Sequence, residues 1–198
     1  MLRSFVLADL ITLANAACGA GSILMCLRYL AEQSRAALWV AVGLLPLAVL
    51  FDFLDGAVAR WRQQHSALGA DLDSLADIVS FGVAPAVLGY TLGMRGGWDV
   101  AILIFFVTCG ISRLARYNAT ADSLSDERGK VSHYEGTPIP TSLVLVAMLG
   151  VAFGLDRVHC QLWWGHWTLL GADLHPLVLT YFISGIAMIS STLRIPKP

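Results

Sequence analysis

The chain has 198 residues, of which 57% are hydrophobic and only 14% are charged, and its mean hydropathy is +0.68. A soluble domain of this length carries about a quarter charged residues, so the composition excludes an ordinary soluble globular protein. The formal net charge is −1 and there is no run of basic residues, so nothing indicates a nucleic-acid partner. The apolar residues fall in runs close to the 20 or so residues that a helix needs to cross a bilayer.

Six such apolar stretches follow one another along the chain, and the longest linker between them contains the polar segment 119–135. We expect each stretch to be one membrane-spanning helix. No stretch could form a separate soluble domain, so residues 1–198 are predicted to be a single all-α integral membrane domain, a bundle of six transmembrane helices. The expected spans are Leu10–Leu30, Ala36–Phe53, Ser74–Leu92, Trp98–Leu114, Pro140–Leu155 and Pro176–Leu193.

The basic residues predict the orientation of this bundle, because Lys and Arg concentrate in the cytoplasmic loops of membrane proteins. If the N-terminus is inside, nine of the 13 basic residues are cytoplasmic: Arg3, Arg60, Arg62, Arg113, Arg116, Arg128, Lys130, Arg194 and Lys197. Four are on the other side: Arg28, Arg35, Arg95 and Arg157. We therefore expect a multi-pass protein of the cytoplasmic (inner) membrane with both termini in the cytoplasm.

The predicted outer loop from His159 to His175 is rich in aromatic and imidazole side chains. It contains Trp163, Trp164 and Trp167, together with His166. A metal site is one interpretation, but the spacings match no ordinary ligand pattern. We interpret the loop as an aromatic belt at the membrane interface, where amphipathic rings settle.

Four aspartates lie around the end of the second expected helix and the start of the third. Asp52 and Asp55 are three residues apart, and Asp73 and Asp77 are four apart. At these spacings each pair shares one face of a helix. A short loop joins the two halves, so they can form an antiparallel hairpin that brings the four carboxylates together near the cytoplasmic ends of the helices.

Four carboxylates in a partly apolar setting repel one another and lose hydration. Acidic residues within membrane spans are rare and usually functional. The alternative, that these aspartates cap helices or pair with Arg60 and Arg62, could explain one or two of them but not four at this spacing. Oxygen ligands suit a hard divalent cation such as magnesium or manganese.

The same run matches D-x2-D-G-x2-A-R-x8-G-x3-D-x3-D at each of its fixed positions, from Asp52 to Asp77. It resembles the signature of the CDP-alcohol phosphotransferase family, whose members are six-helix membrane enzymes. The resemblance implies a transferase in which these aspartates hold two divalent ions, Mg²⁺ or Mn²⁺. It also implies that Asp77 is the catalytic base that takes the proton of the acceptor hydroxyl.

The remaining matching positions are implied to surround the cytidine nucleotide. Gly56 and Ala59 would let the nucleotide approach the backbone, and Arg60 and Gly69 complete the set. Asn15, in the first expected span, is a further candidate for nucleotide contact.

Three further stretches bear on the acceptor alcohol: SFGVAPA from Ser80, RLARYN from Arg113, and YEGTPIP from Tyr134. They are similar to stretches of the membrane-embedded phosphatidylserine synthases. The resemblance therefore implies CDP-diacylglycerol and serine as the substrates, phosphatidylserine and CMP as the products, and a homodimer in the bilayer.

Arg113 and Arg116 are three residues apart at the cytoplasmic end of a helix, and could bind a carboxylate or a phosphate. The alternative is that both contact lipid headgroups, but we favour a substrate role for at least one of them. Ser80, three residues beyond Asp77, could touch the acceptor or could be a packing contact.

Two alternatives stay open. Within the family, the acceptor could be glycerol 3-phosphate, inositol, inositol phosphate or choline, since the main motif does not determine the alcohol. Outside it, a cation transporter could use the Asp cluster as its ion site. Transporters tend to place such sites near the membrane midplane, often between repeats, and this sequence shows neither feature.

Overall fold

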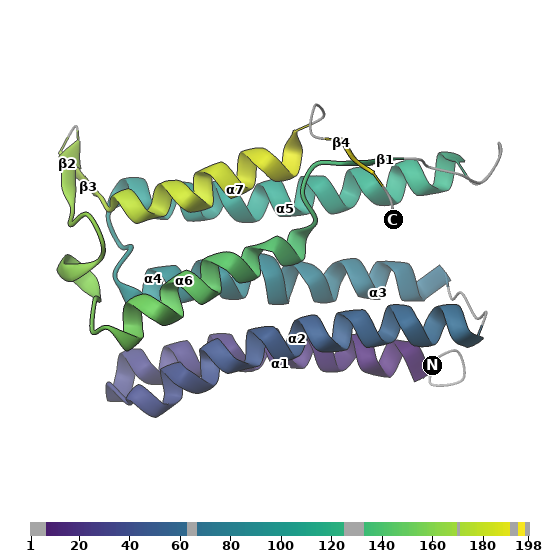
Figure 1. The fold of residues 1–198 in the computed structure, drawn as a ribbon, viewed down its shortest axis with the longest axis horizontal. Helices are drawn as coiled ribbons and strands as arrows, with labels where there is room; N and C mark the ends of the chain where they lie inside the picture. Colours follow the sequence, from purple (N-terminus) through teal and green to yellow (C-terminus); the bar gives the residue numbers. More distant parts are fainter. Residues whose placement is uncertain (1–6, 63–66, 125–132, 170, 191–193, 197–198) are drawn as a thin grey trace.

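The computed structural model describes residues 7–62, 67–124, 133–169, 171–190 and 194–196, which form an elongated bundle of helices (Figure 1). Its α-helices are α1 (Leu7–Glu32), α2 (Arg35–Arg62), α3 (Ala67–Asp77), α4 (Ala84–Leu92), α5 (Gly97–Leu124), α6 (Leu143–Gly154) and α7 (Leu179–Ile189). Its strands are β1 (His133–Glu135), β2 (Trp167–Leu169), β3 (Ala172–Leu174) and β4 (Arg194–Pro196). The strands form two antiparallel pairs, β1 with β4 and β2 with β3.

Four helical segments are long and apolar enough to cross a membrane: Leu7–Glu32, Arg35–Trp61, Gly69–Leu92 and Gly97–Ala119. They coincide with the first four predicted spans. The last two predicted spans correspond to the shorter apolar helices Ile139–Gly154 and Pro176–Ile189. At 1.5 Å per residue these reach only about 24 and 21 Å, less than the roughly 30 Å of a hydrocarbon core. The fold is thus an all-α membrane bundle with four helices of spanning length, and the count of six spans stays a prediction.

The segment Gly69–Leu92 lies at the centre of this bundle. In its most apolar window 67% of the residues are buried, against 33% for Leu7–Glu32 and 28% for each of the other two long segments. The helices α1 and α2, joined by two residues, lie side by side as an antiparallel pair (Figure 1). A residue on the central segment is therefore surrounded by protein, whereas much of α2 and α5 faces outward.

A π-helical turn, Ile78–Val83, joins α3 to α4 within the central segment. In it the N–H of Ala84 donates to the carbonyl of Val79, five residues back. Pro85 follows and has no N–H to offer the carbonyl of Phe81, so a regular α-helix cannot continue through this point. Single π-helical turns inside α-helices are frequent at functional sites, and this one follows Asp77 directly.

Small and polar residues line the buried face of α1. Thr12, Asn15 and Ser22 are all buried, and Ser22 donates to the carbonyl of Ala41 on α2 at 2.9 Å. Gly19 lies against the π-helical turn, where an added Cβ would come within 2.7 Å of the Cα of Ser80. The absence of a side chain at Gly19 lets α1 approach the central segment this closely.

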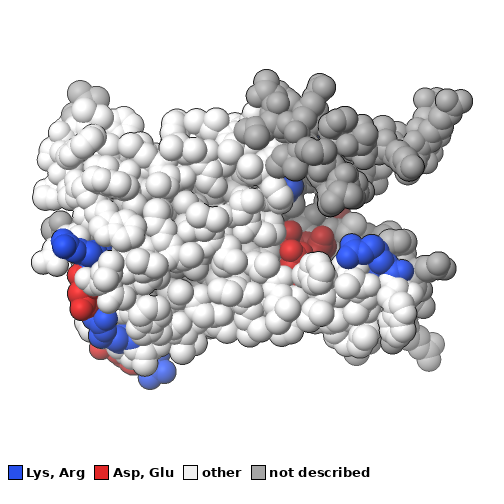
Figure 2. All heavy atoms as spheres, viewed as in Figure 1, with Lys and Arg blue, Asp and Glu red and all other residues white. Residues whose placement is uncertain are grey.

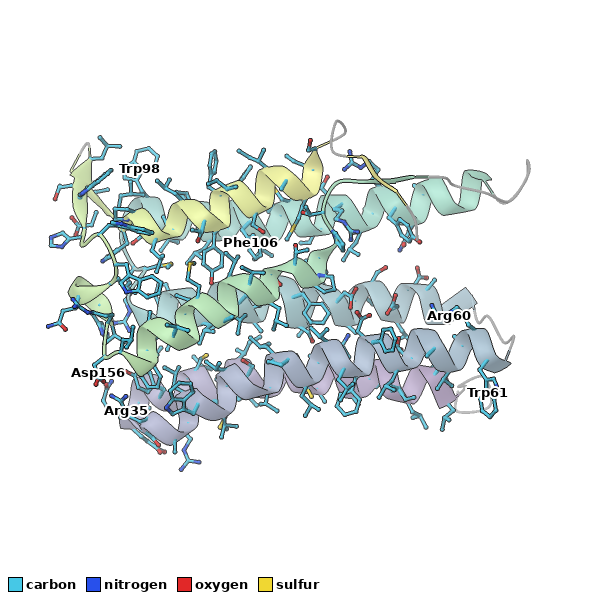
Figure 3. The ribbon with its side chains drawn as sticks, viewed as in Figure 1. Arg35, Arg60, Trp61, Trp98, Phe106 and Asp156 are labelled. Atoms are coloured by element: carbon cyan, nitrogen blue, oxygen red, sulfur yellow. The ribbon has the colours of Figure 1, made fainter. Side chains whose placement is uncertain are left out.

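The two ends of the bundle carry different side chains (Figure 3). At one end an ion pair joins Arg35 to Asp156, and Trp98 donates to the carbonyl of Leu169. Arg60 and Trp61 lie at the opposite end (Figure 3). The predicted outer loop is at the first of these ends, where its β2–β3 hairpin packs beside the start of α5 (Figure 1). Four residues of the basic set used to predict the orientation, Arg3, Arg128, Lys130 and Lys197, lie outside the described residues.

A buried polar contact attaches this loop to α5. The carboxylate of Asp99, which has no exposed surface, accepts hydrogen bonds from the backbone N–H groups of His175 (2.8 Å) and Gly96 (2.9 Å). Oδ2 of Asp99, the oxygen that accepts from Gly96, also contacts Nδ1 of His175 at 2.6 Å. Of the three tryptophans in the predicted aromatic belt, Trp164 and Trp167 are exposed and Trp163 is half-buried. Within the described ranges, a group of three possible metal-ligating side chains occurs only among aspartates at the other end of the bundle.

Candidate active site

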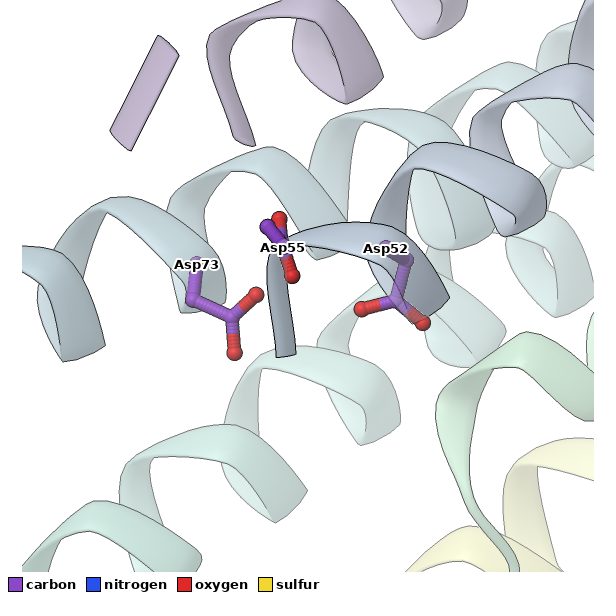
Figure 4. Close-up of side chains that lie close together, drawn as sticks. All are labelled: Asp52, Asp55 and Asp73. Carbon is purple, nitrogen blue, oxygen red and sulfur yellow. The ribbon is translucent and has the colours of Figure 1, made fainter. Parts of the chain in front are cut away.

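Three of the four motif aspartates meet at one point between α2 and α3. Asp52 and Asp55 lie one turn apart on α2, and Asp73 faces them from α3 (Figure 4). One oxygen from each carboxylate lies within 4.8 Å of the others. The hairpin geometry predicted from the spacing of these residues is therefore the one the structure adopts.

The fourth aspartate, Asp77, is the last residue of α3 and is buried. Its Oδ1 accepts a hydrogen bond from the side-chain amide of Asn15 at 3.2 Å. Asp77 is not one of the three carboxylates that converge within 4.8 Å. It lies one helical turn beyond Asp73, next to the π-helical turn.

The helix α1 supplies hydrogen-bond donors to both aspartate pairs. Thr12 donates to Oδ2 of Asp55 at 2.7 Å, and Asn15 donates to Asp77. The amide oxygen of Asn15 is buried and has no hydrogen-bond partner among the described residues. Sequence reasoning missed Thr12, although its position three residues before Asn15, on the same helix face, was a usable signal.

The carboxylates open into a hollow on the surface of the molecule. Figure 2 shows acidic atoms within this hollow and basic atoms beside it. Asp55 is buried, whereas Asp52 and Asp73 are half-buried. The cluster can therefore be reached from solvent while it remains partly enclosed by apolar helices.

This arrangement suits a divalent metal ion. Two oxygens on opposite sides of one Mg²⁺ lie roughly 4.2 Å apart, twice the usual Mg–O distance, and the three oxygens here are separated by no more than 4.8 Å. All the donors are hard carboxylate oxygens, which favour magnesium, manganese or calcium over zinc or copper. Without a cation, the three charges repel one another in a partly dehydrated setting. The cluster can thus hold a metal ion that would offset this repulsion.

The predicted nucleotide residues other than Asn15 lie on α2 after Asp55 and on α3 before Asp73. Gly56 and Ala59 are half-buried on α2, and Gly69 is half-buried on α3. Arg60 is exposed, and its guanidinium lies 3.5 Å from where a Cβ on Gly56 would stand. After Asp55, α2 therefore presents small side chains, which leave its backbone accessible, and the positively charged guanidinium of Arg60 lies next to them.

The predicted acceptor residues lie on α5 and on the π-helical turn. Arg113 and Arg116 are half-buried, and Arg116 points toward the carbonyl of Ile189 at the end of α7, at 3.4 Å. Ser80 has no exposed surface and donates to the backbone carbonyl of Asn15 at 2.9 Å. Asn118, also on α5, donates to Ser74 at 2.9 Å and so joins α5 to α3 beside Asp73, a link that the sequence did not predict.

Comparisons with known proteins agree with this geometry. The sequence profile of the CDP-alcohol phosphatidyltransferase family matches residues 5–187. The CDP-diacylglycerol–serine O-phosphatidyltransferase of Saccharomyces cerevisiae is 43% identical over 206 residues, which is 100% of this chain and 73% of the yeast protein.

Two prokaryotic proteins are also similar. The Mycobacterium bovis protein named CDP-diacylglycerol–serine O-phosphatidyltransferase is 36% identical over 63% of this chain and 43% of its own length. The archaetidylserine synthase of Methanothermobacter thermautotrophicus is 38% identical over 74% of this chain and 58% of its own length. This chain thus spans less than two thirds of either prokaryotic protein.

The family match covers nearly the whole chain, and three of the four aspartates of the predicted motif converge between α2 and α3. The family predicted from the motif is therefore confirmed. The chain is a transferase that belongs to the CDP-alcohol phosphatidyltransferase family.

Proposed function

We propose that this chain transfers a phosphatidyl group from CDP-diacylglycerol to L-serine and so forms phosphatidylserine and CMP. The observation that carries this proposal is the 43% identity, along the whole chain, to a yeast protein named for this reaction. The mycobacterial relative bears the same name, and the archaeal one is named for an archaetidylserine product. The common element in these names is serine.

The metal ions of the reaction would be held by the motif aspartates. Asp52, Asp55 and Asp73 offer converging oxygens, and Asp77 follows one turn later on the same helix as Asp73. We assign two divalent ions, Mg²⁺ or Mn²⁺, to these four carboxylates. Bound there, such ions would neutralise charge on the phosphate oxygens and hold the attacking and leaving oxygens in line.

Asp77 would act as the general base. One of its oxygens accepts from Asn15, and a carboxylate has further lone pairs with which to accept the serine hydroxyl. The hydroxyl oxygen then bonds to the phosphatidyl phosphorus, the bond from that phosphorus to the CMP oxygen breaks, and the hydroxyl proton passes to Asp77.

The CMP part of the donor would lie along α2 and the start of α3. Gly56, Ala59 and Gly69 would allow it to approach the backbone closely, and the exposed guanidinium of Arg60 would bind a phosphate oxygen. The unpartnered amide oxygen of Asn15 supplies a buried acceptor on the α1 side of the same site.

The acceptor would be recognised from α5. Arg113 and Arg116 lie one turn apart and are fit to bind the serine carboxylate or a donor phosphate. Ser80 is part of the same proposal, although its hydroxyl donates to the backbone of Asn15 and would have to turn in order to meet the substrate.

The proposed setting is a six-span bundle in the cytoplasmic (inner) membrane, as one domain over residues 1–198. Its site would face the cytoplasm, both termini would be cytoplasmic, and two copies would form a homodimer. CDP-diacylglycerol would enter from the bilayer, while serine would come from the aqueous side.

The test is an acceptor-specificity assay. The full chain is purified in mild detergent, supplied with CDP-diacylglycerol and Mg²⁺, and assayed for CMP release with serine, glycerol 3-phosphate, inositol, inositol phosphate or choline. We expect release with serine alone, and loss of that release with a chelator or with Asp77→Asn.

The other outcomes separate the parts of this proposal. Release with a different alcohol would refute serine as the acceptor while retaining the family chemistry. Serine-dependent release that persists in EDTA would refute the metal mechanism. If folded protein released no CMP with any acceptor but carried divalent cations across liposomes, the transporter alternative would replace the proposed function.

A further inference from the structure

The hydrogen bond from Thr12 to Asp55 joins α1, which supplies none of the three clustered carboxylates, to the metal cluster. The donor–acceptor distance is 2.7 Å, the usual length of an O–H···O hydrogen bond. Both side chains are buried, Thr12 at 5% and Asp55 at 6% exposed. Asp55 is the least exposed of the three converging aspartates, so water cannot easily replace this donor.

A hydroxyl has one proton, and two oxygens lie within reach of it. Oγ1 of Thr12 is 3.1 Å from the carbonyl of Ala8 and 2.7 Å from Oδ2 of Asp55. The carboxylate is nearer and carries charge, and hydrogen bonds to charged acceptors are the stronger ones. The proton therefore goes to Asp55, and the Ala8 carbonyl is already part of the backbone ladder of α1.

This bond constrains Asp55 in a way that suits a metal ligand. It ties Oδ2 to a fixed helix, which sets the χ angles of the side chain, and it leaves Oδ1 without that restraint. Partners that hold ligating groups in this manner commonly determine how tightly a metal site binds. A second bond of the same kind, from Asn15 to Asp77, comes from the same face of α1.

We propose that Thr12 is a positioning residue of the metal site, which holds the carboxylate of Asp55 in the orientation that binds a divalent ion. The inference rests on the proposed function, because it assumes that the aspartate cluster holds such an ion. The competing interpretation is that the bond merely joins α1 to α2, as the bond from Ser22 to the Ala41 carbonyl does.

Ser22 provides the matched control. Thr12 and Ser22 are both buried hydroxyl residues on α1, and each donates one hydrogen bond to α2. They differ in the acceptor, which is a side-chain carboxylate of the cluster for Thr12 and a backbone carbonyl for Ser22. Removing each hydroxyl separates an effect on the metal site from an effect on helix packing.

The experiment measures Mn²⁺ binding by the purified full chain in detergent, without substrate, from the loss of the free-Mn²⁺ electron paramagnetic resonance signal. We expect Thr12→Val, which keeps the shape of the side chain, to weaken Mn²⁺ binding by about 10- to 100-fold. Thr12→Ser, which keeps the hydroxyl, should bind Mn²⁺ as the wild type does. Ser22→Ala should also retain wild-type binding.

Each other result overturns the inference. Unchanged Mn²⁺ affinity in folded Thr12→Val would show that Asp55 needs no positioning, while the proposed function stands. An equal loss in Ser22→Ala would assign the effect to α1–α2 packing. If the wild type itself binds no Mn²⁺, the metal part of the proposed function fails together with this inference.

Discussion

At the scale of single residues, the carboxylates of the site repel one another unless they bind a metal ion. Asp52, Asp55 and Asp73 each offer a carboxylate oxygen within 4.8 Å of the others, in a setting that only partly hydrates them. Bringing like charges together is unfavourable unless a cation offsets it. The same three carboxylates should therefore destabilise the protein without metal and stabilise it with metal.

Replacing one of these carboxylates should have opposite effects on stability and on activity. In Asp73→Asn, we expect CMP release to fall by more than about 100-fold. Mutating a residue that only hydrogen-bonds to a metal ligand already lowers metal affinity or activity by about 10- to 100-fold, and Asp73 is proposed to be a ligand itself. In EDTA, the melting temperature should equal or exceed that of the wild type, because one repulsive charge is gone. Added Mg²⁺ should raise it less than in the wild type.

Asp71→Asn is the control for this prediction, because Asp71 lies on the same helix only two residues away but is exposed. It should retain both the activity and the Mg²⁺-induced rise in melting temperature. A lower melting temperature for Asp73→Asn in EDTA would contradict the repulsion on which this prediction is based.

At the scale of elements, the site depends on how closely α1 approaches the central segment. The hydrogen bond from Asn15 to Asp77 reaches across this contact, and the bond from Thr12 on the same helix joins α1 to Asp55 on α2. Gly19, one turn beyond Asn15, makes the approach possible, since a Cβ there would come within 2.5 Å of Oγ and 2.7 Å of the Cα of Ser80. Part of this clash is with backbone atoms, which a change of rotamer cannot relieve.

Gly19→Ala should therefore push α1 away from the π-helical turn. Overpacking of this kind costs about 1–3 kcal/mol of stability, and we expect a corresponding fall in the unfolding transition of the detergent-solubilised protein. Activity should fall further than the folded fraction does, because Asn15 would be displaced from Asp77.

Gly43→Ala is the matched control, since a Cβ at Gly43 on α2 would meet nothing within 4 Å. It should be neutral or slightly stabilising, because alanine favours helix more than glycine does. If the two alanine variants had the same stability and activity, the close approach of α1 at Gly19 would not be needed to position Asn15 beside Asp77.

At the scale of the whole molecule, the two ends of the bundle differ in their side chains and in their roles. The aspartate cluster lies toward the end that carries Arg60 and Trp61, and the opposite end carries the Arg35–Asp156 ion pair and the β2–β3 hairpin (Figure 3). The proposed orientation places the first end in the cytoplasm and the second outside.

Cysteine labelling tests this orientation. Trp61 is 81% exposed and Trp164 is 67% exposed, at opposite ends of the bundle. Trp61→Cys and Trp164→Cys would be made separately in a background where the four native cysteines are replaced, and intact cells would be treated with a membrane-impermeant maleimide. We expect Trp164→Cys to react in intact cells and Trp61→Cys to react only after permeabilisation.

The labelling has an internal control in the permeabilised sample, where both cysteines should react. The reverse pattern would show that the bundle is inverted and would refute the cytoplasmic site. Reaction of both positions in intact cells would place both ends of the bundle outside the cell. That result would contradict the three predicted spans that lie between Trp61 and Trp164 in the sequence.

Much of this arrangement could be predicted from local sequence patterns. The spacing of the aspartates determines which face of each helix they occupy, so the meeting of Asp52, Asp55 and Asp73 was predictable. The same prediction placed Asp77 with them, whereas Asp77 lies one turn beyond this group. The first four apolar stretches were located for a similar reason, since length and composition alone mark a spanning helix.

Other features could not be predicted because they depend on contacts between distant elements. The bonds from Thr12 to Asp55 and from Asn118 to Ser74 join helices that are far apart in sequence. The α-helices α6 and α7 begin three residues after the predicted starts Pro140 and Pro176, because the residues before each helix form a short 3₁₀ turn. The π-helical turn also left no clear trace in the hydrophobic pattern, apart from Pro85.

That turn has a consequence for how the central segment is compared with related helices. A π-helical turn holds one residue more than the α-helical turn it replaces, so it acts as a single-residue insertion. Everything after Val83 is then rotated by about 100° relative to an uninterrupted α-helix. A relative with a plain α-helix here would match α3 and α4 only with a one-residue gap between them. Gly89 on α4 lies against Tyr181 on α7, where an added Cβ would be 3.1 Å from the tyrosine hydroxyl oxygen. Deleting one residue within Ile78–Val83 would turn Gly89 away from Tyr181, while Asp73 and Asp77 would keep their positions on the helix face.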